Sequence, residues 1–221
     1  MFINFLVEDA SGKKMLEILL SKMLPAESGV AYKIHSYKGI GHIPVKGVTA
    51  PKAVKARMLL DNLPKLIGGL GNVARKSGFE MAIVVVCDLD DNDEKTFRKM
   101  LYDLLAKIVS APRTYFCLAI EEGEAWLLGD IAAVVAAYPR CKRDVLNRYK
   151  NDSICGTWEL MADAVEVGGA AALKRGGYQM IGFAKYRWAE TIAPNMRIAA
   201  NKSSSFHEFV KTVMGIKEIA D

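Results

Sequence analysis

Short hydrophobic runs alternate along the chain with longer segments in which hydrophobic residues recur every three or four positions. The runs at 2–7, 82–87 and 113–119 have the character of strands buried on both faces of a parallel sheet. A shorter strand is expected at 31–37. The periodic segments predict helices at 12–24, at 52–77 with an interruption near Pro64 and Gly68, from Asp91 to about Ile108, and at 122–137.

This order of elements predicts an α/β fold with a mostly parallel sheet flanked by helices. From Arg140 onward the strand pattern disappears, and short helical segments are separated by glycines and Pro194. We therefore expect an α/β core at 1–139 and an all-helical extension at 140–221 that packs on it.

Local signals place several helix ends. Ser11 is expected to cap the first helix, and Asp91 and Glu94 have the spacing of a capping box. Residues 203–205 are three serines, which are expected to cap the last helix. The stretch 185–188, Lys-Tyr-Arg-Trp, is interpreted as part of an amphipathic helix whose cations extend to solvent.

The net charge of +5 is unevenly distributed. Residues 31–80 hold nine Lys or Arg and two acidic residues, a balance of +7, whereas residues 81–139 have a balance of −5. Residues 140–221 return to +4. An acidic centre between basic flanks suits a metal site that receives a polyanion, although solvated cations are also common on ordinary surfaces.

The composition places the protein in the cytoplasm. Its four cysteines lack the Cys-x-x-Cys spacing of zinc sites and are expected to be reduced. The N-terminus lacks the basic region of a signal peptide, and no apolar stretch approaches the roughly 18 residues of a membrane helix. We expect no contact with a membrane.

Acidic residues follow three of the predicted strands. Glu8 comes after the first, Asp88 and Asp90 after the second, and Glu121, Glu122 and Glu124 after the third. Acids are favoured in the first turn of any helix by its dipole, which accounts for some of them. Because ligands of parallel sheets bind at the carboxyl ends of the strands, the pattern predicts a shared divalent-metal site.

Several segments resemble one known family. Val7-Glu-Asp-Ala-Ser-Gly-Lys13, Asp88-Leu-Asp90, Glu122-Gly-Glu-Ala-Trp-Leu-Leu-Gly-Asp130 and Ser203-Ser-Ser-Phe-His-Glu-Phe209 are similar to Toprim domains, and specifically to the DUF4276 group of Toprim-like bacterial proteins. Together these segments span most of the chain. The Glu-x-Trp-Leu-Leu-x-Asp segment is the most specific part of the resemblance.

The resemblance implies Mg²⁺ or Mn²⁺ and phosphodiester chemistry on nucleic acid, DNA or RNA. Glu8 matches the family Glu, Asp88 and Asp90 match its Asp-x-Asp, and Glu122 and Glu124 match the acids before the Trp. Metal ligands would thus come from these five residues, with Glu8, Asp88, Asp90 and Glu124 as catalytic residues. Relatives often accompany a partner ATPase, sometimes in anti-phage systems.

One departure from the family concerns Asp9, which stands where many Toprim domains have Gly. This acid could join the metal site or cap the first helix. Substrate phosphates are expected to contact basic residues of the 31–80 stretch, namely Lys38, Lys46, Lys52, Lys55 and Arg57.

Two alternatives stay open. The acids could hold an ion in a non-catalytic subunit that binds nucleic acid or a metal-nucleotide, because a fold does not guarantee turnover. A phosphatase of the haloacid dehalogenase type also places Asp-x-Asp after an apolar strand. That class expects Thr or Val two positions later, where this chain has Asn92.

Overall fold

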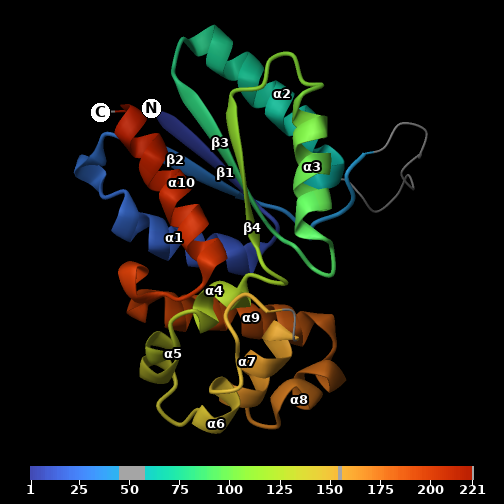
Figure 1. Ribbon diagram of the computed structural model, residues 1–221, viewed down its shortest axis with the longest axis vertical. Coiled ribbons are helices and arrows are strands. Elements are labelled where there is room, and N and C mark those ends of the chain that lie inside the picture. The colour runs from blue at the N-terminus through green and yellow to red at the C-terminus, as the bar shows by residue number, and fades with distance from the viewer. Residues whose placement is uncertain (45–57, 154–155, 221) are drawn as a thin grey trace.

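The computed structural model describes residues 1–44, 58–153 and 156–220. In this part of the chain one sheet has the strand order β2-β1-β3-β4, and every pairing in it is parallel. Its strands are β1 (Phe2–Val7), β2 (Ala31–Ser36), β3 (Met81–Asp88) and β4 (Arg113–Ala119). The carboxyl ends of the strands therefore share one edge (Figure 1). The predicted α/β fold with a mostly parallel sheet is confirmed.

Helices cover both faces of the sheet (Figure 1). One face packs against α1 (Ala10–Met23) and α10 (Ser204–Ala220), and the other against α2 (Leu59–Ser77) and α3 (Glu94–Leu105). Side chains alternate between the two cores because successive strand residues point to opposite faces. In β1, Phe5 packs toward α1 and Leu6 packs toward α2.

Six further helices of the described chain gather beneath the carboxyl edge of the sheet (Figure 1). They are α4 (Glu124–Leu128), α5 (Ile131–Ala137), α6 (Arg143–Leu146), α7 (Thr157–Val165), α8 (Gly169–Gly176) and α9 (Tyr178–Ile192), with 3-10 turns at Ala26–Ser28, Ala193–Asn195 and Ile198–Ala200. A helical C-terminal region is thus confirmed. Helix α10 packs beside β4. Its buried residues belong to the same hydrophobic core as those of the helices beneath the sheet. The division of the chain at residue 139 stays a prediction.

Two predicted helix caps are wrong. Helix α1 begins after Asp9, whose carboxylate accepts hydrogen bonds from the Gly12 amide and the Ser11 hydroxyl, each at 2.7 Å. Ser11 therefore supports the cap and is not itself the cap. Helix α3 is capped by Asp93 and not by Asp91. In both cases the carboxylate nearest the free amides of the first turn takes the cap.

Two helices differ from the prediction in whether they are interrupted. Helix α2 continues through Pro64, because Leu63 and Ile67 bury its apolar face against the sheet and outweigh the missing amide. The helix predicted at 122–137 instead divides into α4 and α5 at Gly129. A side chain at Gly129 would collide with Asn201, whose Oδ1 lies 2.1 Å from the position of a Cβ.

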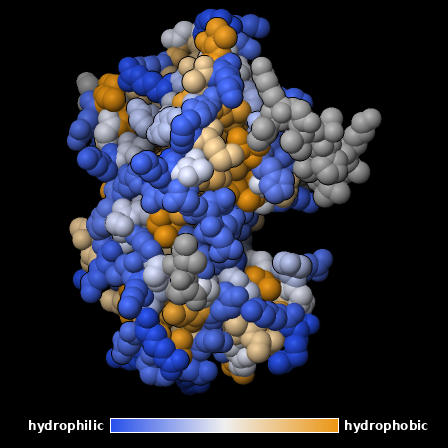
Figure 2. Space-filling view, turned by 45° about the vertical axis from the view of Figure 1, so that its right-hand side comes forward, coloured by the Kyte–Doolittle hydropathy of each residue, from blue (hydrophilic) through white to orange (hydrophobic). Residues whose placement is uncertain are grey.

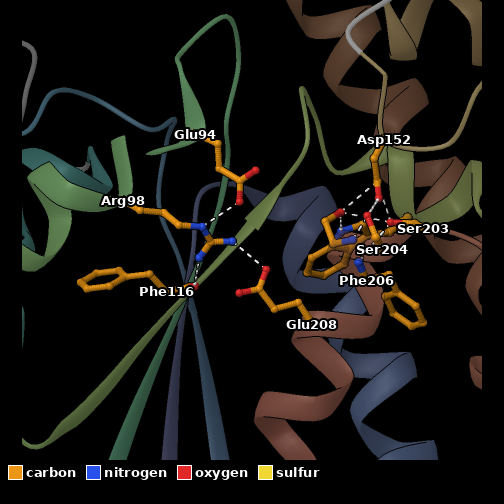
Figure 3. Close-up of polar contacts among 10 residues, drawn as sticks. Glu94, Arg98, Phe116, Asp152, Ser203, Ser204, Phe206 and Glu208 are labelled. Carbon is orange, nitrogen blue, oxygen red and sulfur yellow. Dashed lines mark hydrogen bonds and ion pairs between the residues drawn. The ribbon is translucent and has the colours of Figure 1, made fainter. Parts of the chain in front are cut away.

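Arg98 fastens α10 to the rest of the fold (Figure 3). Its guanidinium pairs with Glu94 at 2.8 Å on its own helix and with Glu208 of α10 at 2.7 Å. A third bond, of 3.1 Å, reaches the carbonyl oxygen of Phe116 in β4. One planar cation thus links α3, β4 and α10 through its fixed fork of donors.

Asp152 organises the start of α10 (Figure 3). Its carboxylate accepts hydrogen bonds from the Ser203, Ser204 and Ser205 hydroxyls and, at 3.0 Å, from the Ser205 amide. The Ser203 hydroxyl oxygen accepts from the Phe206 amide at 3.0 Å. The predicted capping role is confirmed for Ser203, while Ser204 and Ser205 lie in the first turn and donate to Asp152, an added anion at the helix N-terminus.

The surface visible in Figure 2 is mostly hydrophilic, with separate small hydrophobic patches. Each helix in the described ranges is too short or too polar to cross a membrane. Cys87 and Cys117 are buried and free, as expected of strand cysteines, and Cys141 is also free. Cys155 lies outside the described residues.

Candidate functional site

Glu8 and Asp88 meet at the carboxyl edge of the sheet. The register of β1 and β3 pairs Val7 with Val86, so Glu8 lies beside Cys87 and one position from Asp88. The Asp88 backbone amide donates a hydrogen bond of 3.3 Å to Oε2 of Glu8. Two acids that are 80 positions apart in sequence therefore become neighbours.

A small cavity lies between this edge and the helices beneath it. Glu8, Asp88, Glu124 and Lys185 all line it. Its volume is about 30 Å³, which suits one or two water molecules or a single ion. Glu124 is 4% exposed. The structure thus brings together acids that follow three different strands, and Asp9 also lines the cavity.

Asp90 lies close enough for its charge to act on Glu8, but outside the cavity. It is exposed and does not line the cavity wall. Its backbone adopts the left-handed conformation (φ 50°), as does that of Glu121 (φ 60°). The Asp90 amide donates to the carbonyl oxygen of Glu121 at 2.9 Å, which joins the loops after β3 and β4. Left-handed non-glycine residues store backbone strain, typically at functional turns.

Glu121 and Glu122 serve the N-terminus of α7. The Glu121 carboxylate accepts from the amides of Gly156 at 2.7 Å and Thr157 at 3.0 Å. Glu122 accepts from the Trp158 amide at 3.1 Å. Free amides and the helix dipole both favour an anion there. The acids after β4 therefore divide between capping a distant helix and lining the cavity.

Lys185 of α9 reaches into this acidic group. Its Nζ lies 3.0 Å from Oε2 of Glu124 and 3.3 Å from Oε1 of Glu122, and its side chain is 16% exposed. The interpretation of this lysine as a cation that extends to solvent is wrong. The sequence did contain a signal that Lys185 faces the protein interior. Residues three and four positions apart share a helix face, and Lys185 precedes the buried Trp188 and Ala189 by those spacings.

Burial and like charge shift the acids of the site. Burial raises the pKa of Glu8 to about 7, against the lowering effect of the hydrogen bond from Asp88. Burial and the Glu8 charge together hold the pKa of Asp88 well above its usual range. Burial also raises the pKa of Glu122 to about 7, although Lys185 opposes this shift. The Glu124 and Glu122 charges outweigh burial and raise the pKa of Lys185.

The donors at the cavity are of the type that Mg²⁺ and Mn²⁺ prefer, since both ions take carboxylate oxygens. Glu8, Asp88 and Glu124 could supply three of them. Within the described ranges, however, no three acidic, His or Cys side chains are already arranged to hold a metal ion. The donor chemistry fits a divalent ion, while the present arrangement is built around Lys185.

Asp9 and the basic residues predicted to bind phosphate are the remaining candidates from the sequence. Asp9 uses both carboxylate oxygens to cap α1, which favours the capping role over the metal role. Lys38 is exposed just after β2, where the Gly39 amide donates to the carbonyl oxygen of Glu8 at 3.0 Å. Lys38 therefore lies near the carboxyl edge. The other predicted phosphate contacts, Lys46, Lys52, Lys55 and Arg57, lie outside the described residues.

Comparison of the chain with protein-family models, curated proteins and solved structures gave no match. The resemblance to Toprim proteins therefore stays a prediction from the sequence. Because parallel α/β folds carry many unrelated activities, the function must be argued from the site itself.

Proposed function

We propose that this protein binds Mg²⁺ or Mn²⁺ at the carboxyl edge of its sheet and hydrolyses phosphodiester bonds in nucleic acid. The observation that carries the proposal is that Glu8, Asp88 and Glu124 line one ion-sized cavity. Carboxylates gathered in a poorly solvated cavity repel one another, and a divalent cation relieves that repulsion. This edge is also where parallel sheets bind their ligands.

In this proposal Glu8 and Asp88 would hold the ion, and Glu124 would join them once it is free of Lys185. A bound divalent ion supplies Lewis acidity and lowers the pKa of a bound water. Exposed Lys38 beside the Glu8 backbone would contact a backbone phosphate. Asp90 and Glu122 stay candidate ligands. The composition suggests a cytoplasmic location and the Toprim resemblance implies a partner ATPase, and both belong to the proposal.

A second candidate function is non-catalytic binding of nucleic acid or a metal-nucleotide. It is favoured by the ion pairs of Lys185, which already occupy Glu122 and Glu124. In such a subunit the acids would stabilise the fold or a bound ion without turnover. Both candidates use the same surface, but only the enzyme would release cleavage products.

The deciding experiment incubates the protein with labelled single- and double-stranded DNA and RNA in Mn²⁺, Mg²⁺ or EDTA. We expect metal-dependent cleavage by the wild type and a loss of roughly 100-fold in Glu8→Gln and Asp88→Asn. Asp103→Asn is the matched control, because Asp103 is exposed on α3 and pairs with Lys99. Asp90→Asn measures the contribution of the exposed acid.

Binding without cleavage of any substrate, with and without any ATPase that is encoded nearby, would favour the non-catalytic subunit. Hydrolysis of small phosphomonoesters in place of nucleic acid would instead support the phosphatase alternative. Cleavage by Asp88→Asn at the wild-type rate would remove the proposed site.

A further inference from the structure

Lys185 occupies the position in which a metal ion would be expected. It is contributed by α9, whereas the acids around it come from the ends of β1, β3 and β4. Its ammonium is within ion-pair distance of Glu122 and Glu124, and the same side chain lines the cavity with Glu8 and Asp88. The helices beneath the sheet thus supply the cation for acids of the sheet.

We propose that the Lys185 ammonium is the resident cation of this cavity, and that a divalent ion can bind there only by displacing it. The competition half of this inference rests on the proposed metal site. The resident-cation half rests on the ion pairs alone.

Burial makes the lysine necessary when no metal is bound. Glu124 is 4% exposed, and an unpaired carboxylate at that depth is strongly unfavourable. Lys185 supplies the compensating charge at 3.0 Å. Removing the ammonium alone therefore leaves an uncompensated acid, while removing both partners does not.

The size of the cavity makes the two cations exclusive. The free space that remains beside the Lys185 ammonium is about 30 Å³, which accepts one or two water molecules but is too small for a hydrated divalent ion. A divalent ion carries twice the charge and interacts more strongly with several carboxylates. On metal binding, the ion pairs of Lys185 with Glu124 and Glu122 would be replaced by contacts of these carboxylates with the metal or with water. The link between α9 and the strand ends is then broken, so metal binding is coupled to the attachment of α9.

The test titrates Mn²⁺ by calorimetry into metal-free protein without nucleic acid, at constant pH and ionic strength. We expect Lys185→Met to bind Mn²⁺ about tenfold more tightly than the wild type, because the competing cation is gone. Lys14→Met is the matched control. It removes a lysine of α1 that pairs with Glu17 and Glu190. Equal or weaker binding by Lys185→Met would overturn the competition.

A second measurement follows thermal unfolding in EDTA. Lys185→Met should melt below the wild type, and Lys185→Met/Glu124→Gln should recover part of the loss. If Lys185→Met melts like the wild type, the ammonium is not the resident cation. If the single variant Lys185→Met does not fold, the double variant Lys185→Met/Glu122→Gln replaces it in the Mn²⁺ titration, because the double variant keeps Glu8, Asp88 and Glu124.

The outcomes separate the two proposals. Mn²⁺ binding by Lys185→Met but not by the wild type would support the inference and count against the proposed metal-dependent activity of the wild type. Absence of Mn²⁺ binding in both proteins would overturn the proposed function and the competition. The unfolding data would still decide the role of the ammonium.

Discussion

The backbone amide of Asp88 donates a hydrogen bond to the carboxylate of Glu8, and this bond links the carboxyl ends of the neighbouring strands β3 and β1. The bond holds one acid beside another, so their charges repel at short range. Burial is the main cause that raises the pKa of both carboxyls; the Glu8 charge adds to the shift of Asp88, and the charges of Asp9 and Asp90 add to that of Glu8. Such a pair is costly to keep without a nearby cation or bound protons, which makes it the most informative feature of the site.

Asp88→Asn should remove the response of the protein to metal. In the wild type, millimolar Mn²⁺ should raise the melting temperature by a few degrees, because it binds the folded state preferentially. The variant should show no such rise. Its melting temperature in EDTA should equal or exceed that of the wild type, because one repelling charge is gone. Differential scanning fluorimetry checks both, with Asp103→Asn as control. A wild type indifferent to Mn²⁺ would contradict the prediction.

The stability of the metal-free protein should fall as pH rises from about 4.5 to about 7. Glu8 and Glu122 both have folded-state pKa values raised from 4.5 to about 7 by burial. In this range the folded state binds more protons than the unfolded state, so the free energy of unfolding decreases with pH. We expect a fall in melting temperature on the order of 5 °C.

Thermal melts in EDTA across this range test the effect of pH. Glu122→Gln should flatten the profile, because its side chain does not titrate. Mn²⁺ should oppose the fall near pH 7.5, where the acids are ionised. A melting temperature that rises steadily from pH 4.5 to 7 in EDTA would show that other groups dominate.

Asp152→Ala should loosen α10. The substitution removes an anion that accepts hydrogen bonds from Ser203, Ser204 and Ser205 at the start of the helix. Loss of a helix cap of this kind costs about 1–2 kcal/mol of unfolding free energy. Hydrogen exchange should quicken in the first turns of α10. Asp144→Ala is the control, because Asp144 is exposed and pairs with Arg148 within one turn. Equal exchange in both variants would contradict the prediction.

Nucleic-acid affinity should depend steeply on salt, and Lys38 should contribute to that dependence. Each phosphate neutralised by a cation releases counterions, so Lys38→Glu should reduce the slope of log affinity against log salt by about one. Lys107→Glu is the control. This lysine follows α3 and precedes β4, at the opposite edge of the sheet. Fluorescence anisotropy at several salt concentrations measures the slope. The same slope in both variants would place the phosphates elsewhere.

The strands and the acids that follow them were readable from local sequence. Buried parallel strands appear as continuous apolar runs, and Glu8 and Asp88 come directly after two of them. Once the strands are parallel, their carboxyl ends must share an edge, so these acids had to approach one another. The close approach of Asn201 to Gly129, which leaves no room for a Cβ, could not be predicted because Asn201 lies far away along the chain.

The sequence by itself determined the alternation of strands and helices, the parallel sheet and the edge at which acids gather, because each depends on nearest neighbours and side-chain period. Only the tertiary structure decided which acids face the cavity. Glu121 was drawn to the N-terminus of α7, and Glu124 was paired with Lys185. These partners lie more than 30 positions away along the chain. Ion pairs and hydrogen bonds form between groups that folding brings close together, and local sequence does not show which distant groups will become partners.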